Sequence, residues 1–318
     1  MSGYPDRRYF ARIAEGSGFR AGPLETVFRL AELLSRIDAR FGDELSLRGG
    51  TALNLLHLDL PRLSVDIDLD FVGVADADGA QQRRPGLLAE LGDLARAAGY
   101  EPAPERASYA MGHLRLPYLD ASSRPAQLKL DVNFLDRVPV LRPERRPVRH
   151  PFADDLPASE MLTFALAELA AAKTIALVRR GLARDLFDVA MLSEFPGIDE
   201  QLLRTALIVR GAGYPPPSPL DYSPDVVDSV RQVRWRSEVL AVVRRPVPIS
   251  LDAARESART FLRRAATFDG REREFVEQIE HGQLRPGLLL PEQVRDRIAI
   301  NPALLWRLAS GAGTLEER

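Results

Sequence analysis

The strongest constraint on the fold is an alternation of acidic and apolar residues in the segment SVDIDLDF, residues 64–71. Period-two alternation is typical of a β-strand, and it puts Asp66, Asp68 and Asp70 on one face and the apolar residues on the other. Three like charges on one face repel each other, and aspartate is a poor strand former. Either solvent at a sheet edge or a bound divalent cation offsets this cost, and the segment alone leaves both interpretations open.

A second alternating segment, LKLDVNF (128–134), repeats the pattern and puts Lys129 and Asp131 on one face. If both segments belong to one sheet, Asp66, Asp68 and Asp131 converge on a pair of metal ions. Such a carboxylate set is what two-metal phosphoryl or nucleotidyl transfer needs. The four histidines of the chain are widely spaced, so a zinc site is not expected.

Two glycines, Gly49 and Gly50, follow a predicted short strand (44–48) and precede the helix-forming sequence TALNLL. Backbone N–H groups at a glycine turn and at the start of a helix bind phosphate well. A Gly-Gly pair alone is more often an ordinary turn. Its position shortly before Asp66 favours a phosphate site at the same edge of the sheet.

The composition indicates a globular protein of about two domains, with 318 residues, 45% of them hydrophobic and 28% charged. Without an apolar run of about 20 residues or a signal peptide, we expect a cytoplasmic protein with no membrane partner. The lack of cysteine excludes disulfides, thiolate metal sites and cysteine nucleophiles. The net charge of -2 gives no overall attraction to nucleic acid. The arginine-rich runs LRPERRPVR (141–149) and VRQVRWR (230–236) are either solvated surface or local binding patches.

The hydrophobic periodicity changes at about residue 150, from a mixture of helices and strands to helices alone. Helices are predicted over 23–40, 81–100, 159–181 and 182–196. The helix in 81–100 is expected to start near Pro85. The helix 159–181 is expected to have its N-cap at Ser159 and to stop at Gly181. Strands are predicted over 44–48, 64–71, 111–120 and 127–136, and a proline-rich loop over 211–224. The pattern predicts an α+β fold that continues into a mainly α-helical C-terminal domain.

The segment from Leu47 to Phe71 resembles the first motif of the AbiEii-type nucleotidyltransferase toxins, which share the DNA polymerase β-like nucleotidyltransferase fold. The residues that match the four family motifs in order are Gly49, Gly50, Thr51, Ala52, Leu53, Arg62, Ser64, Asp66 and Asp68; Lys129, Asp131 and Val132; Lys173, Ala176 and Arg180; and Arg184, Asp185 and Asp188. Both lysines of this arginine-rich chain fall inside these motifs. Asp70 lies outside them and is interpreted as a solvated acid or a neighbour of the metal ligands.

The resemblance implies a nucleotidyltransferase core domain over 1–156, with a small mixed sheet flanked by helices. A helical domain over 157–318 is expected to contribute to the active-site cleft. In this interpretation Asp66, Asp68 and Asp131 hold two Mg²⁺ ions, and Asp131 helps to activate the attacking hydroxyl. The residues assigned to binding the nucleoside triphosphate are Gly49, Gly50, Thr51, Ser64, Lys173, Arg180 and Arg184.

Asp188 is expected to act beside Lys173, whereas Asp185 is interpreted equally well as functional or as a salt-bridge partner of Arg180 or Arg184.

The family includes members that extend the 3′ end of tRNA and that are paired with an antitoxin protein. The resemblance therefore implies a toxin that transfers NMP from an NTP to tRNA and so inhibits translation and growth. Two alternatives stay open: a nucleotidyltransferase that modifies proteins, and an inactive nucleotide-binding module. The presence of all the motif carboxylates argues against the inactive module, because carboxylates that repel each other would not be expected at a site that has lost its activity.

Overall fold

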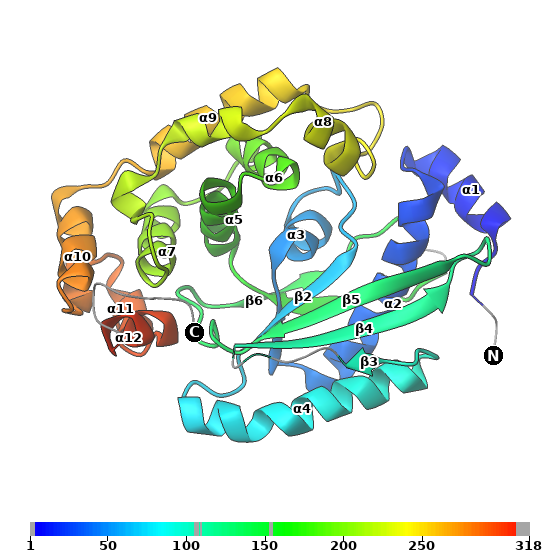
Figure 1. Cartoon of the computed structure of the whole chain (residues 1–318), viewed down its shortest axis with the longest axis horizontal. Helices are drawn as coiled ribbons and strands as arrows, with labels where there is room; N and C mark the ends of the chain where they lie inside the picture. Colours follow the sequence, from blue (N-terminus) through cyan, green and yellow to red (C-terminus); the bar gives the residue numbers. More distant parts are fainter. Residues whose placement is uncertain (1–3, 105–107, 109, 153–154, 310–318) are drawn as a thin grey trace. The chain divides into compact units, whose positions relative to one another are not determined.

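The computed structural model describes residues 4–104, 108, 110–152 and 155–309 (Figure 1). The chain forms two compact units. The first comprises residues 1–137, 144–163 and 240–248, and the second comprises residues 138–143, 164–239 and 249–318. The domain boundary between residues 156 and 157 stays a prediction, and each unit takes segments from both sides of that point.

A seven-stranded mixed sheet, in the order β3-β4-β5-β2-β1-β7-β6, forms the centre of the first unit in the described residues. Its strands are β1 (Leu45–Leu47), β2 (Asp66–Phe71), β3 (Ala103–Pro104), β4 (Met111–Leu119), β5 (Pro125–Asn133), β6 (Glu144–Pro147) and β7 (Glu160–Thr163). Strand β2 runs parallel to β5 and β1 runs parallel to β7, while the other neighbours are antiparallel. The mixed sheet with flanking helices confirms the α+β fold class.

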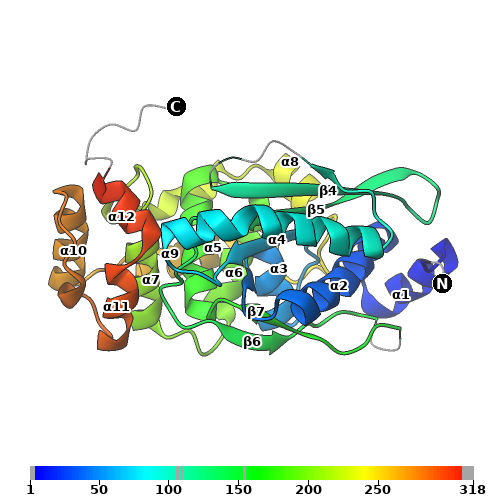
Figure 2. The same cartoon turned by 90° about the horizontal axis from the view of Figure 1, so that it is seen from below.

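Helices cover both faces of this sheet. They are α1 (Arg7–Ser17), α2 (Ala21–Phe41), α3 (Gly49–Ala52), which continues as the π-helical turn η1 (Leu53–His57), and α4 (Ala77–Ala97). Helices α2 and α4 lie over one face and α3 over the other (Figures 1 and 2). The apolar side chains of β2, Ile67, Leu69 and Phe71, are fully buried. The acidic side chains of β2 therefore point to the opposite face of the sheet.

The predicted start of the second helix near Pro85 is wrong. Helix α4 begins at Ala77 because the side chain of Asp76 caps it, accepting a 2.7 Å hydrogen bond from the Gly79 N–H. Pro85 lies inside the helix, at an exposed position. The capping aspartate is a stronger start signal here than the proline.

The predicted N-cap at Ser159 is also wrong. Residues 160–163 form β7 between β1 and β6, and helix α5 starts at Leu166. The Thr163 hydroxyl donates a 3.0 Å hydrogen bond to the Leu47 carbonyl, so pairing with a distant strand overrides the local helical pattern. The predicted stop at Gly181 is confirmed, with the glycine in the left-handed conformation at φ 56°.

The second unit is helical in the described residues. Its helices are α5 (Leu166–Arg180), α6 (Ala183–Glu194), α7 (Glu200–Ala212), α8 (Gln232–Arg234), which continues as η4 (Trp235–Val239), α9 (Leu251–Ala265), α10 (Gly270–Glu280), α11 (Arg295–Ala299) and α12 (Pro302–Ala309). Short 3-10 turns join them: η2 (Pro219–Asp221), η3 (Pro224–Ser229), η5 (Pro286–Leu288) and η6 (Glu292–Val294). Helix α5 packs against α6 and α7, and α6 packs against α9 (Figure 1).

A buried carboxylate fastens residues 138–143 to α5 within the second unit. Glu168 is fully buried and accepts hydrogen bonds from the N–H groups of Val140 and Leu141. The Arg210 guanidinium lies 3.0 Å from the same carboxylate. Burial raises the pKa of Glu168 even though Arg210 and the two N–H groups oppose that shift.

In the described part of the chain, none of the helices combines the length and the apolar character that crossing a bilayer requires.

Of the two interpretations of Asp70 from the sequence, the solvated acid is wrong, because its side chain is fully buried. The Asn133 side-chain amide donates a 2.7 Å hydrogen bond to Asp70 Oδ1, and Arg48 Nε lies 3.2 Å from the same oxygen. Asn133 faces Asp70 in the parallel register of β2 and β5. The third acid of the strand therefore ties β2 to β5 and to the end of β1.

Replacing Asp70 with alanine is expected to lower the free energy of unfolding by about 3 kcal/mol, because it leaves buried polar partners unsatisfied. Asp59→Ala is the control, since its side chain is 91% exposed and its nearest arginine atom is 3.8 Å away. The control is expected to change stability by less than about 0.5 kcal/mol. Urea unfolding of both variants measures the difference, and equal losses would show that Asp70 does not hold the strands.

Candidate active site

Two carboxylates face each other across neighbouring strands on the acidic face of the sheet. The register of β2 and β5 pairs Asp68 with Asp131 and Asp66 with Lys129. Asp66, Asp68 and Asp131 are half-buried, whereas Lys129 is exposed. The structure therefore confirms that both alternating segments belong to one sheet and share its polar face.

The Gly-Gly turn lies directly against these acids. Gly49 has φ +72°, and a Cβ atom added there would lie 2.6 Å from Asp68 Oδ2. A Cβ on Gly50 would lie 2.6 Å from the Arg62 guanidinium and 3.0 Å from the Ser64 hydroxyl. A Cβ at either position would therefore displace these side chains, and the positive φ of Gly49 also favours glycine.

Thr51 holds the start of α3 on β2. Its side chain is fully buried, and its hydroxyl donates a 2.5 Å hydrogen bond to the Asp66 carbonyl. The Arg48 N–H donates to the Asp68 carbonyl at 2.9 Å. These bonds fix the glycine turn beside the two aspartates.

Asp131 has two further neighbours that the sequence motifs do not include. His113 Nδ1 lies 2.8 Å from Asp131 Oδ1, and Arg115 Nη1 donates to the same oxygen at 2.9 Å. Both residues come from β4, where His113 is the register partner of Asp131. Alternation along the predicted strand 111–120 places them on one face, but it does not say which strand lies beside them.

The carboxylates of Asp66, Asp68 and Asp131 fit a divalent cation by their chemistry, since Mg²⁺ prefers carboxylate oxygens and open positions for water or phosphate. They are half-buried on one polar face, and Asp68 and Asp131 are direct neighbours. In the described residues, however, no three acidic or histidine side chains form a ready ligand cluster. Asp131 Oδ1 is engaged by His113 and Arg115, so a metal would share or replace those partners.

The motif residues of α5 and α6 form a separate ionic cluster in the second unit. Lys173 Nζ lies 2.7 Å from Asp188 Oδ2 and 3.3 Å from Asp185 Oδ1. The Lys173 side chain is 9% exposed, and both aspartates are buried. Lys173 is therefore the shared counter-charge of two buried carboxylates.

Arg180 completes this cluster from the end of α5. Its guanidinium donates to both oxygens of Asp185, at 2.6 and 3.0 Å, although its own side chain is 55% exposed. Burial favours the neutral acid, but Lys173 and Arg180 outweigh it and hold the pKa of Asp185 below its usual value. Of the two pairings considered for Asp185, the structure shows the one with Arg180. Arg184 is half-buried at the start of α6.

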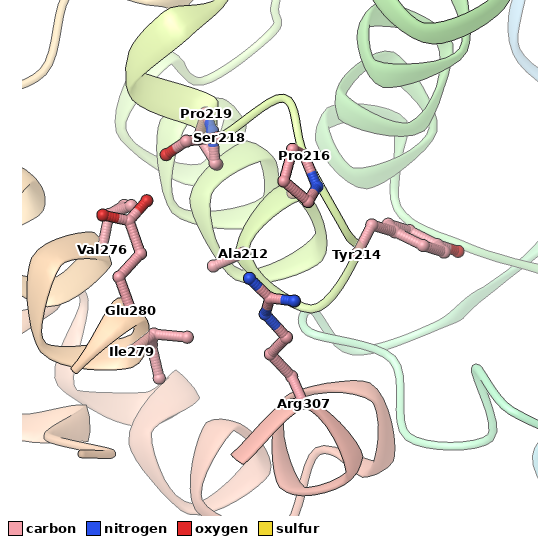
Figure 3. A pocket seen from close by; sticks show the side chains of 10 residues that line it. Ala212, Tyr214, Pro216, Ser218, Pro219, Val276, Ile279, Glu280 and Arg307 are labelled. Carbon is pink, nitrogen blue, oxygen red and sulfur yellow. The ribbon is translucent and has the colours of Figure 1, made fainter. Parts of the chain in front are cut away.

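A small pocket also lies in the second unit, between the end of α7, the following turn, α10 and α12 (Figure 3). Glu280 and Arg307 give it one acid and one base among mostly apolar and small side chains. None of the site residues predicted from the sequence lines it. The motif residues therefore define the candidate site independently of this pocket.

Comparisons with known proteins agree with the family resemblance of the sequence motifs. The family model "Nucleotidyl transferase AbiEii toxin, Type IV TA system" matches residues 32–264. Among solved structures, the nucleotidyltransferase toxin MenT4 from Mycobacterium tuberculosis H37Rv is similar, with a TM-score of 0.67 and 22% sequence identity. That similarity covers 93% of this chain and 99% of MenT4. A search of the curated proteins found no match.

The fold and the motif order define a nucleotidyltransferase of the toxin type. The chain belongs to the AbiEii nucleotidyl transferase toxin family, whose model matches most of its length. The family is one of type IV toxin–antitoxin systems, so an antitoxin partner and an NTP substrate follow from membership.

Gly49→Ala is expected to abolish most nucleotidyl transfer, because the new Cβ would displace the Asp68 carboxylate. The positive φ adds a stability cost of about 1–2 kcal/mol. Gly99→Ala is the matched control, because Gly99 has φ +88° and no atom within 4 Å of the added Cβ. Both variants should show a similar loss in urea unfolding, but only Gly49→Ala should lose activity in a labelled-NTP assay. Equal activity would contradict the steric role of Gly49.

Lys173→Met is expected to destabilise the protein by about 3–5 kcal/mol, because it removes the counter-charge of two buried carboxylates. The other lysine supplies the control, since Lys129 is exposed on β5. Lys129→Met should change stability by less than about 0.5 kcal/mol. Unfolding curves of the two variants measure the contrast, and equal small effects would exclude a structural role for the Lys173 ammonium.

Proposed function

We propose that this nucleotidyltransferase transfers NMP from an NTP to the 3′ end of tRNA and thereby inhibits translation. The observation that carries the proposal is the placement of Asp68 and Asp131 as register partners on a polar sheet face beside the Gly49–Gly50 turn. This arrangement sets metal-ligating carboxylates beside a backbone turn suited to phosphate.

In this proposal Asp66, Asp68 and Asp131 hold two Mg²⁺ ions. When bound, the ions supply positive charge to the triphosphate and to the attacking oxygen. The acceptor hydroxyl oxygen forms a bond to the α-phosphorus, and the bond to the leaving pyrophosphate breaks. Asp131 helps to accept the proton of the attacking hydroxyl, and catalysis otherwise consists of alignment and charge stabilisation.

The turn residues Gly49 and Gly50 are proposed to position the β- and γ-phosphates through backbone N–H groups, with Thr51 and Ser64 supporting the turn. The motif residues of the second unit keep the roles that family membership suggests. Lys173, Arg180 and Arg184 are proposed to contribute positive charge for the nucleotide, and Asp188 to hold the Lys173 ammonium in place. The 2.7 Å contact between Lys173 and Asp188 supports that last role.

The test is incubation of the purified protein with labelled NTPs, Mg²⁺ and total tRNA. We expect label in ribonuclease-sensitive material and a loss of rate by roughly 10³-fold in Asp66→Ala and Asp68→Ala, since each removes a proposed metal ligand. Asp59→Ala, an exposed acid away from β2, should retain full activity.

Three other outcomes would decide against parts of the proposal. Full activity of Asp66→Ala would overturn the site assignment. Label in a protease-sensitive acceptor would identify a protein-modifying enzyme instead. Tight NTP binding with no label in any macromolecule would identify an inactive nucleotide-binding module.

A further inference from the structure

The two arginine-rich runs of the sequence differ in how their charges are neutralised. In the run 141–149, Arg145 lies against Asp38, Asp43 and Glu160, Arg146 lies against Glu144, and Arg149 lies near Asp59. Acids therefore neutralise much of that run, which suits an ordinary solvated surface.

The run VRQVRWR, residues 230–236, spans α8 and the start of η4 and is largely open. Arg231, Arg234 and Arg236 are exposed, and Val233 between them is 77% exposed. Arg234 is bonded to Glu238, but in the residues that the structure describes neither Arg231 nor Arg236 forms an ion pair. The nearby acid Asp228 is bound to Arg259, so it does not neutralise these two side chains.

A buried aromatic residue anchors this open run. Trp235 is 2% exposed, and its ring centroid lies 6.0 Å from that of Phe187 on α6. Successive helix residues project about 100° apart, so Arg234 and Arg236 lie to either side of the inward Trp235. The arginines therefore project from a turn that is fixed to α6 rather than from a free loop.

The anchor also places the run beside the motif residues of α6. Phe187 immediately precedes Asp188 in the sequence, and Arg184, one helical turn before Phe187, shares its side of α6. Arg184 likewise forms no ion pair with the acids in the described part of the chain. Positive charge in the second unit thus extends from the family motif onto α8 and η4.

We propose that Arg231 and Arg236, on the α8–η4 turn, bind the phosphate backbone of the acceptor RNA. The proposal rests on the proposed function for its choice of tRNA. Guanidinium groups without acidic partners bind phosphate with two N–H donors each, and the contact carries no base specificity. The net charge of -2 means that such binding needs a local patch of this kind.

The experiment compares two double variants that each remove two positive charges: R231A/R236A, and R146A/R149A as the matched control. Binding of total tRNA is measured by filter retention without NTP across a salt series, so the readout does not depend on catalysis. For R231A/R236A we expect roughly tenfold or more loss of affinity. The negative slope of log K against log[salt] should become shallower by about 1.5, because two phosphate contacts are lost. The control should match the unmodified protein.

A conservative variant separates charge from folding. R231K/R236K should recover most of the affinity, because lysine also binds phosphate, although as a point charge. Arg234 is left unchanged in every variant, since it pairs with Glu238. Thermal unfolding is expected to be the same for all variants, because the substituted side chains are exposed.

Equal loss of affinity in the two alanine variants would indicate a general charge effect and overturn the proposal. An unchanged salt slope in R231A/R236A would also overturn it, while leaving transfer to tRNA intact as a function. If the two arginines instead control labelling of a protease-sensitive acceptor, the surface binds protein rather than RNA. Arginine-dependent tRNA binding without any transfer would support the surface and refute the proposed function.

Discussion

The parallel register between β2 and β5 is the constraint on which the rest of the candidate site depends. It places Asp68 opposite Asp131 while the apolar side chains of both strands are buried on the other face. A shift of one residue would turn these acids into the core, so the hydrophobic pattern that stabilises the sheet also fixes the carboxylates. Asp70 and Asn133, one pair further along, lock the same register with a buried hydrogen bond.

Much of this arrangement could be predicted from the sequence because it follows from local periodicity. Alternation in residues 64–71 and 128–134 assigns both strands and their polar faces, and Gly49 and Gly50 mark the turn before the helix. Lys173 and Asp188 match separate motifs, and the structure shows them in contact at 2.7 Å. The strands and the glycine turn follow from neighbouring residues, whereas Lys173 and Asp188 were predicted from the family motifs.

What the sequence did not reveal depends on partners far along the chain. Asp70 has the same local pattern as Asp66 and Asp68 and lies outside the family motifs, but its burial against Asn133 and Arg48 does not follow from the alternation. His113 and Arg115 become neighbours of Asp131 because β4 pairs with β5, which alternation alone cannot specify. Strand β7 was not predicted either, because its pairing with β1 and β6 overrides a local helical pattern.

The contrast between the two lysines has a practical chemical consequence. The Lys173 ammonium is enclosed by two carboxylates, whereas the Lys129 ammonium is exposed on β5 in register with Asp66. Because every other basic side chain of this chain is an arginine or a histidine, Lys129 is its one solvent-accessible primary amine on a side chain. An amine-directed fluorophore that reacts with a side chain would thus attach at Lys129, beside the acidic face of the sheet, so the protein has a side-chain reporter position without any engineered cysteine.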